Sequence, residues 1–170
     1  MKKVLLVIDM QNDFIDGALG TPEAQAIVEN VKKKIEGFDG QVWYTRDTHP
    51  ENYMETREGK NLPVPHCIKG TAGWQITDAL SALACHRIID KPTFGSTELQ
   101  ALLVKEGMED ITLIGLCTDI CVISNAMLCK AALPEAEITV DAACCAGVTP
   151  ESHLRALEAM QICQIRVENL

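Results

Sequence analysis

Short apolar runs alternate with amphipathic segments along this chain, and this alternation limits the folds that it can adopt. Runs suited to strands occur at residues 4–8, 41–46, 86–90, 110–115, 137–141 and 164–168. Helical patterns fall between them, at residues 21–38, 76–84, 96–106, 121–132 and 150–160. Strands separated by helices pair in parallel through right-handed crossovers, with helices on both faces of the sheet. The sequence therefore predicts a three-layer α/β/α sandwich with a six-stranded parallel sheet.

Length and charge restrict the class of protein further. The 170 residues, of which 47% are apolar, suffice for one sizeable core, so we expect a single domain over residues 1–170. The 15 basic and 24 acidic residues leave a net charge of −9. Nucleic acids and anionic membranes both attract basic surfaces. We therefore expect no nucleic-acid or membrane partner.

The N-terminal segment and the cysteines indicate a compartment. No apolar run reaches the roughly 18 residues that a membrane span needs. The first apolar stretch ends at Asp9 with no small-residue cleavage site after it, which favours a strand over a signal peptide. We therefore expect a cytoplasmic protein whose eight cysteines are mostly reduced thiols. Apolar sequence neighbours predict that Cys85, Cys129 and Cys163 lie in the core.

Reactive side chains follow three of the predicted strands. Asp9 ends the first strand, Lys91 follows the third, and Cys121 comes after the fourth, where a helical pattern begins. In open α/β sheets, sites form beyond the carboxyl ends of the strands, where the strand order reverses. A helix N-terminus lowers the pKa of a thiol, an acid can take its proton, and a lysine stabilises anions. These three residues are candidates for nucleophilic catalysis, although each taken singly also fits a cap, a turn or a solvated side chain.

A second candidate site lies between Asp47 and Gly73, where prolines and glycines predict a long loop without regular structure. A loop this long in a compact domain is usually functional. Asp47 and His49 would point to the same side of an extended segment, and His66 follows later in the loop. A carboxylate and two imidazoles suit zinc, iron or manganese. The same residues would also fit an ordinary solvated loop.

Five segments, taken together, resemble the isochorismatase-like cysteine hydrolases, and among these most of all the nicotinamidases. They are residues 7–14 (VIDMQNDF), 45–50 (TRDTHP), 65–73 (PHCIKGTAG), 91–94 (KPTF) and 115–122 (GLCTDICV). Each motif is weak to moderate alone, but the five occur in order over nearly the whole chain. The resemblance implies the Rossmann-like fold of these hydrolases, with strand order 3-2-1-4-5-6. Strands one and four would then lie side by side.

The resemblance also implies roles for individual residues. It implies Cys121 as the nucleophile, Asp9 as the general base and acid, and Lys91 as the third member of a catalytic triad. It further implies a non-proline cis peptide before Cys117 and an oxyanion hole made by the N–H groups of Cys117 and Cys121. The residues expected in the substrate pocket are Phe14, Phe94 and Leu116.

A metal site is implied in the same way. In nicotinamidases the residues that match Asp47, His49 and His66 bind a metal ion, often with one further His or Glu between them. No third histidine lies there in this sequence, and Glu58 is the best candidate, followed by Glu55 and Glu51. The expected ion is a divalent transition metal, with zinc first and iron or manganese as alternatives.

The sequence thus predicts a cysteine hydrolase that cleaves the C–N amide bond of a small molecule through a thioester, with nicotinamide as the leading candidate. Pro63 stands where nicotinamidases usually carry an aromatic residue that stacks on the pyridine ring, which leaves the substrate open. The alternatives are a ureido, carbamoyl or isochorismatase-type hydrolase, and a non-catalytic small-molecule-binding homologue. A nucleotide-binding module is disfavoured because no glycine-rich turn follows the first strand. By resemblance we also expect a homodimer or homotetramer.

Overall fold

The computed structural model describes residues 1–170, and at its centre lies a six-stranded sheet whose strands are all parallel. The strands are β1 (Lys3–Ile8), β2 (Gln41–Asp47), β3 (Arg87–Lys91), β4 (Asp110–Leu116), β5 (Glu137–Ala146) and β6 (Arg166–Glu168). Their spatial order is β3-β2-β1-β4-β5-β6, which confirms the predicted sheet. The order reverses between β1 and β4, so these two strands lie side by side at the switch point.

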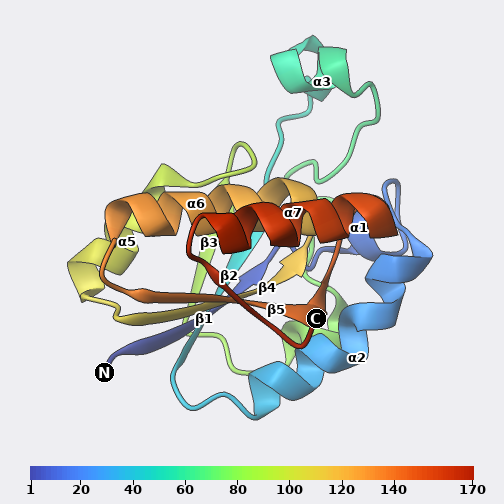
Figure 1. Ribbon diagram of the computed structural model, residues 1–170. Helices are drawn as coiled ribbons and strands as arrows, with labels where there is room; N and C mark the ends of the chain where they lie inside the picture. The colour runs from blue at the N-terminus through green and yellow to red at the C-terminus, as the bar shows by residue number, and fades with distance from the viewer.

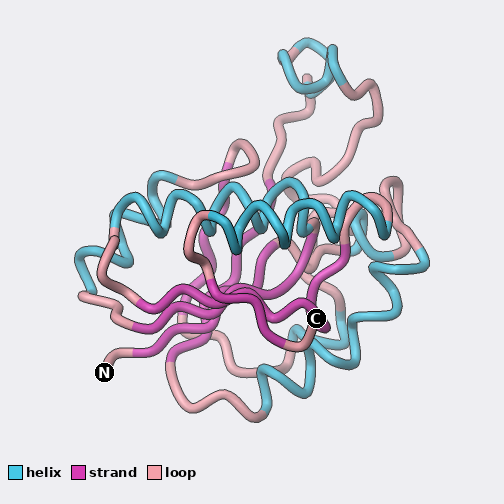
Figure 2. Tube along the Cα trace, viewed as in Figure 1, coloured by secondary structure: helices cyan, strands magenta, loops and turns pink.

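Helices cover both faces of this sheet (Figures 1 and 2). On one face lie α5 (Thr97–Glu106), α6 (Ile123–Ala132) and α7 (Pro150–Ile162), and on the other lies α2 (Pro22–Glu36). The short helices are α1 (Asn12–Ile15), α3 (Arg57–Asn61) and α4 (Asp78–Ser81). The fold is therefore the predicted three-layer sandwich, and α3 extends beyond its layers in Figure 1. None of the helices has both the length and the apolar composition that crossing a membrane requires.

Strand β1 shows how the sequence produces two cores. Val4, Leu6 and Ile8 belong to the apolar cluster under α5, α6 and α7. Leu5 and Val7 belong to the cluster against α2. Successive side chains of a strand point to opposite faces, so a strand buried on both faces needs an unbroken apolar run. The sequence of β1 has this run, and all five side chains are fully buried.

The ends of the longer helices follow local sequence signals. The Oγ1 of Thr21 accepts the N–H of Ala24 at 3.0 Å, and Pro22 occupies the first position of α2. The last turn of α5 ends at Gly107, whose φ of +66° is a left-handed conformation that glycine adopts without a steric penalty. These signals predict the starts and ends of α2 and α5 to within two residues.

The structure differs from the predicted elements in four places, and one of them is the helix predicted over residues 76–84, of which only α4 (Asp78–Ser81) forms. A 3₁₀ turn (Tyr53–Glu55) and α3 interrupt the segment that the sequence predicts to be irregular. Helix α1 was not predicted, because its four residues carry too little periodicity. Strand β5 continues to Ala146, beyond the predicted end at residue 141. The break in its apolar run is Asp141, whose carboxylate pairs with the Lys34 ammonium at 2.7 Å and so can stay buried.

The prediction that three cysteines lie in the core is confirmed for only one of them. Cys129 on α6 is fully buried, whereas Cys85 and Cys163 are exposed. Cys85 lies in the turn before β3, and Cys163 directly follows the last residue of α7. Apolar sequence neighbours therefore do not bury a residue that falls in a turn or at a helix end.

Candidate active site and metal centre

Three reactive side chains meet at the carboxyl ends of the strands. The Nζ of Lys91 lies 2.6 Å from Oδ2 of Asp9 and 3.5 Å from Sγ of Cys121. Asp9 and Lys91 are fully buried, and Cys121 is 5% exposed. The fold thus brings together the acid, the lysine and the cysteine that the sequence places after three different strands. We call Asp9, Lys91 and Cys121 the triad.

The backbone at the switch point and a threonine on β2 orient Asp9. Asp9 directly follows β1 with a φ of +48°, a left-handed conformation that aspartate tolerates better than most residues. The Oγ1 of Thr45 donates a hydrogen bond to Oδ1 of Asp9 at 2.6 Å. On β4, a Cβ at Gly115 would overlap the carbonyl oxygen of Ile8, so the close approach of β1 and β4 requires glycine there. Sequence reasoning missed Thr45, although it lies two residues before Asp47 and therefore on the same strand face.

The charges in the triad favour a protonated lysine beside an unusually basic aspartate. Burial alone would lower the pKa of Lys91, but the neighbouring Asp9 and Asp47 carboxylates outweigh this effect, so the pKa of Lys91 is raised. Burial raises the pKa of Asp9, and the Lys91 ammonium only partly opposes this effect. An aspartate with a raised pKa accepts a proton more readily than an exposed one, as a general base must.

The electrostatic state of Cys121 corrects the interpretation from the sequence. The sequence predicts a thiol pKa lowered by a helix N-terminus, whereas burial and the neighbouring Asp9 raise the pKa of Cys121 well above its usual value, against the lowering effect of Lys91. Cys121 also lies inside a π-helical turn (Thr118–Val122) that precedes α6, and not at the first position of an α-helix. The resting thiol therefore keeps its proton until a base removes it.

Replacing Lys91 by methionine tests this electrostatic interpretation. Methionine has a comparable length and no charge, so Lys91→Met removes a contribution that lowers the pKa of the Cys121 thiol. We expect the pH profile of Cys121 alkylation by iodoacetamide, followed peptide by peptide with mass spectrometry, to move to higher pH. The exposed Cys163 in the same samples is the internal control, and its profile should not move. Superimposable Cys121 profiles would show that the lysine does not act on the thiol.

The turn that carries Cys121 also leaves a backbone donor available. The peptide bond between Leu116 and Cys117 is cis, as the resemblance implies. The carbonyl oxygen of Cys117 accepts the N–H groups of Ile120 and Val122 at 3.1 and 3.0 Å, which closes the turn. The N–H of Cys117 itself donates to no other group of the protein. It is therefore free to donate to a ligand beside Cys121.

A second cluster lies on the loop that follows β2. One ligand atom from each of Asp47, His49, Glu58 and His66 lies within 4.8 Å of the others. His49 Nε2 is 2.8 Å from Asp47 Oδ2 and 3.6 Å from Glu58 Oε1, and His66 Nε2 is 3.5 Å from the same Asp47 oxygen. Of the three glutamates considered from the sequence, the structure places only Glu58 in this cluster. The cluster adjoins the triad, because Asp47 Oδ1 lies 3.8 Å from Lys91 Nζ.

The donor chemistry of this cluster fits a divalent transition metal. Two imidazole nitrogens and two carboxylates are ligands that zinc, iron and manganese accept. Asp47 Oδ1 is buried and accepts no hydrogen bond. His66 Nδ1 lies 2.8 Å from the carbonyl oxygen of Val64, which leaves Nε2 turned toward the other ligands. Burial would raise the pKa of Asp47, but hydrogen bonds from His49 and His66 hold it below its usual range, so this ligand is ionised.

Gln11 holds Asp47 in place through the backbone. Its Oε1 accepts the N–H of Asp47 at 2.7 Å, and its Nε2 donates to the carbonyl oxygens of Asp47 and Trp74 at 2.8 and 2.9 Å. Gln11 is fully buried, so these bonds are shielded from water. The amide therefore ties the end of β2 to the segment after β1. Sequence reasoning missed this contact, although Gln11 lies within the motif at residues 7–14.

The residues predicted to line a substrate pocket have different surroundings. Phe14 is partly buried, and its ring centroid lies 5.5 Å from that of His66. Phe94 is 42% exposed, and Leu116 is buried in the core cluster against α2, so its side chain contributes to that core. Sequence reasoning missed Tyr53, whose buried ring lies 4.9 and 5.0 Å from the rings of the two clustered histidines. The 3₁₀ turn creates this proximity, and no periodicity in the sequence predicts that turn.

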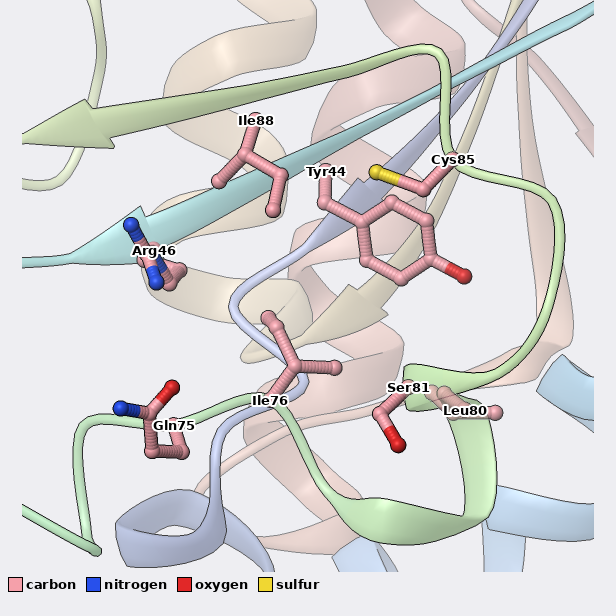
Figure 3. Close-up of a pocket in the computed structure, with 8 residues that line it drawn as sticks. All are labelled: Tyr44, Arg46, Gln75, Ile76, Leu80, Ser81, Cys85 and Ile88. Atoms are coloured by element: carbon pink, nitrogen blue, oxygen red, sulfur yellow. The ribbon is translucent and has the colours of Figure 1, made fainter.

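A pocket of about 170 Å³ lies beside the edge strand β3 and shares no lining residue with either cluster (Figure 3). Its lining comes from β2, β3 and the segment between them, and consists of Tyr44, Arg46, Gln75, Ile76, Leu80, Ser81, Cys85 and Ile88. Arg46 Nε is already paired with Asp90 Oδ1 at 2.7 Å, and the guanidinium stacks on the Trp74 ring at 3.7 Å. The pocket thus presents no free charge, and we place the candidate active site at the two buried clusters.

Comparisons with known proteins identify the family of this chain. Residues 3–168 match the family model described as the isochorismatase domain. The structure is similar to that of a pyrazinamidase from Pyrococcus horikoshii in complex with zinc, with 30% identity, a TM-score of 0.85 and complete coverage of both chains. It is also similar to a nicotinamidase/pyrazinamidase from Bacillus subtilis, with 28% identity and a TM-score of 0.82 over 98% of this chain and 99% of the other.

A sequence relative from Arabidopsis thaliana is 31% identical over 88% of this chain and 83% of its own, and it is named a probable inactive nicotinamidase. The family model covers residues 3–168, which is nearly the whole chain. The strand order β3-β2-β1-β4-β5-β6 is the one that the family resemblance implies. The resemblance seen in five sequence segments is therefore confirmed, and this chain belongs to the isochorismatase family.

Proposed function

We propose that this protein is a cysteine hydrolase of the nicotinamidase type, which hydrolyses the amide of nicotinamide or a close analogue and releases ammonia. The observation that carries the proposal is the buried triad, in which the Lys91 ammonium contacts both the Asp9 carboxylate and the Cys121 sulfur. The solved structures named as nicotinamidase and pyrazinamidase support the substrate class. A non-catalytic binder has no need of an acid and a lysine around a buried thiol.

In the proposed mechanism Asp9 carries the proton transfers, Cys121 forms the covalent bond and Lys91 stabilises negative charge. Asp9 takes the proton of the Cys121 thiol, and the thiolate attacks the carbonyl carbon of the amide. The N–H groups of Cys117 and Cys121 donate to the resulting oxyanion, and Lys91 stabilises the negative charge. Asp9 then gives the proton to the nitrogen, so that ammonia leaves and a thioester remains. Asp9 finally removes a proton from the water that attacks the thioester. The C–S bond breaks, the carboxylic acid leaves, and Asp9 returns the proton to the Cys121 sulfur, which restores the thiol.

We also propose that Asp47, His49, Glu58 and His66 hold a divalent transition metal, with zinc first and iron or manganese also compatible. The relative from Pyrococcus horikoshii is in complex with zinc. When bound, the metal would supply a coordination position for a ring nitrogen or a water molecule, outside the covalent steps. The side chains of the four ligands orient that position, while bond cleavage depends on the triad.

The metal proposal predicts a selective effect of His66→Ala. The substitution removes one of four ligands, so we expect metal content in protein purified without chelator to fall from about one ion per chain to well below half of that. Elemental analysis by mass spectrometry measures it. His86→Ala is the matched control, because His86 is exposed and its Nδ1 accepts a backbone N–H from Val42, away from the cluster. Equal metal content in the two variants would contradict the assignment.

A screen of ammonia release tests the proposed reaction. The compounds are nicotinamide, pyrazinamide and a set of ureido and carbamoyl compounds, each with and without chelator, and kcat/KM is compared. We expect nicotinamide to have the highest value and nicotinate to be its product. A higher value for a ureido or carbamoyl compound would assign the chain to another hydrolase of the family. Binding of nicotinamide without hydrolysis of any compound would instead support the non-catalytic homologue.

We further propose that the chain forms a single domain over residues 1–170, works in the cytoplasm, and assembles into a homodimer or homotetramer. All eight cysteines are free thiols, which supports a reducing compartment. Size-exclusion chromatography with light scattering gives the mass in solution, and a mass of one chain, near 18.6 kDa, would contradict the assembly.

A further inference from the structure

Asn125 links the segment of the nucleophile to the segment that follows Lys91. It lies on α6, four residues after Cys121, and is fully buried. Its Nδ2 donates to the carbonyl oxygen of Cys121 at 2.8 Å and to that of Phe94 at 3.1 Å. Its Oδ1 accepts the N–H of Ser96 at 3.0 Å. One side-chain amide therefore joins the backbone of two segments that are distant in sequence.

The segment that Asn125 contacts also restrains the lysine of the triad. It connects β3, which ends at Lys91, to α5. Near its start, Lys91 Nζ donates to the carbonyl oxygen of Thr93 at 3.1 Å. Further along, Phe94 and Ser96 are held by Asn125. The contact of 3.5 Å between the Lys91 ammonium and the Cys121 sulfur thus joins side chains from two segments, and Asn125 holds the backbones of these segments together.

We propose that Asn125 is a positioning residue that sets the separation of Cys121 and Lys91, an inference that rests on the proposed function of the triad. Asparagine suits this task because one rigid amide supplies two donor hydrogens and an acceptor, and all of these are used here. In a buried site each bond is also stronger than in water. Helix α6 by itself would hold Cys121 against the sheet, but it would not hold the segment after Lys91.

A serine at position 125 distinguishes the two contacts of Asn125, the link to the segment after Lys91 and the bond to the nearby Cys121 carbonyl oxygen. A serine hydroxyl in a helix can donate to the carbonyl oxygen four residues earlier, which is that of Cys121. It is too short to reach Phe94 as well. Asn125→Ser therefore keeps the bond to the Cys121 carbonyl oxygen, in the turn before α6, and cuts the link to the segment after Lys91, whereas Asn125→Ala removes both.

Ser96→Ala is the matched control for a purely structural role. The Oγ of Ser96 accepts the N–H of Leu99 at 3.0 Å and caps α5, so the substitution destabilises the same region and lowers the melting temperature. It leaves the backbone N–H that Asn125 contacts in place. A structural role would make the three variants alike in kinetics and different only in melting temperature.

The experiment measures kcat and KM for nicotinamide, together with the pH midpoint of Cys121 alkylation. We expect Asn125→Ser and Asn125→Ala to lower kcat about 10- to 100-fold, because a displacement of about 1 Å between reacting groups costs up to that much. KM should change by less than the same factor. The alkylation midpoint should move to higher pH, in the direction expected for Lys91→Met. Three charged groups face the thiol (Asp9, Lys91 and Asp47), and the substitution weakens the contact with the cation among them, Lys91.

Ser96→Ala should keep kcat and the alkylation midpoint of the wild type while its melting temperature falls. Wild-type values of both quantities in Asn125→Ser would overturn the inference, as would an equal loss of kcat in Ser96→Ala. If Asn125→Ala does not fold, Asn125→Ser decides the question. Failure of the wild type to hydrolyse any amide would contradict the proposed function alone, since the alkylation midpoint still reports whether Asn125 positions Lys91 against the thiol.

Discussion

Cys121→Ala should abolish amide hydrolysis, with kcat lowered by at least about 10⁴-fold, because it removes the atom that forms the thioester. The fold should persist, since the substitution deletes one sulfur atom from a side chain that behaves as a small apolar residue. The lysine and the aspartate of the triad keep their contact in this variant. Ammonia release measures the loss, and circular dichroism confirms the fold.

Two other cysteines provide controls for this result. Cys85 and Cys163 are exposed and lie outside the triad and the metal cluster. Cys85→Ala and Cys163→Ala should each retain kcat within about twofold, as surface substitutions usually change little. Hydrolysis at the wild-type rate in Cys121→Ala, together with loss of activity when another cysteine is replaced, would show that Cys121 is not the nucleophile.

Asp9→Asn should lower kcat by about 10²–10⁴-fold, the usual contribution of a general acid–base group. Asparagine has nearly the same shape but cannot take the proton of the Cys121 thiol, whose raised pKa makes a base necessary. The buried Lys91 ammonium is then left with only Asp47 as a neighbouring carboxylate, so the melting temperature should fall. The rate is therefore measured at 25 °C on protein shown to be folded at that temperature.

Asp90→Asn is the matched control for this substitution. Asp90 also lies at the end of a strand, but its carboxylate pairs with Arg46 and does not belong to the triad. The substitution breaks an ion pair that is partly exposed, and such pairs contribute little to stability. We expect kcat within about threefold of the wild type. Comparable rates for Asp9→Asn and Asp90→Asn would mean that Asp9 is not the base, and would favour a binding protein that keeps the fold.

The candidate site was predictable to the extent that it depends on strand ends. Asp9 and Cys121 follow β1 and β4, Lys91 is the last residue of β3, and parallel strands bring their carboxyl ends to one edge of the sheet. The contact between the three side chains then follows from the strand order. The fourth member of the metal cluster was not predictable in this way. Glu58 lies on α3, within 3.6 and 3.8 Å of the two histidine nitrogens, whereas Glu51 and Glu55 offer the same ligand type in the same loop and give no local signal that separates the three.

The sequence by itself determined the alternation of strands and helices, the caps of the long helices, and the residue types available at each strand end. These features depend on local periodicity and on the chemistry of single residues. Only the tertiary structure decided the direction of the Cys121 pKa, the choice of Glu58, and the link that Asn125 makes to the segment after Lys91. Each depends on burial and on distances between segments far apart in the chain, because the charge on a thiol and the reach of an amide are set by neighbours in space that no local pattern records.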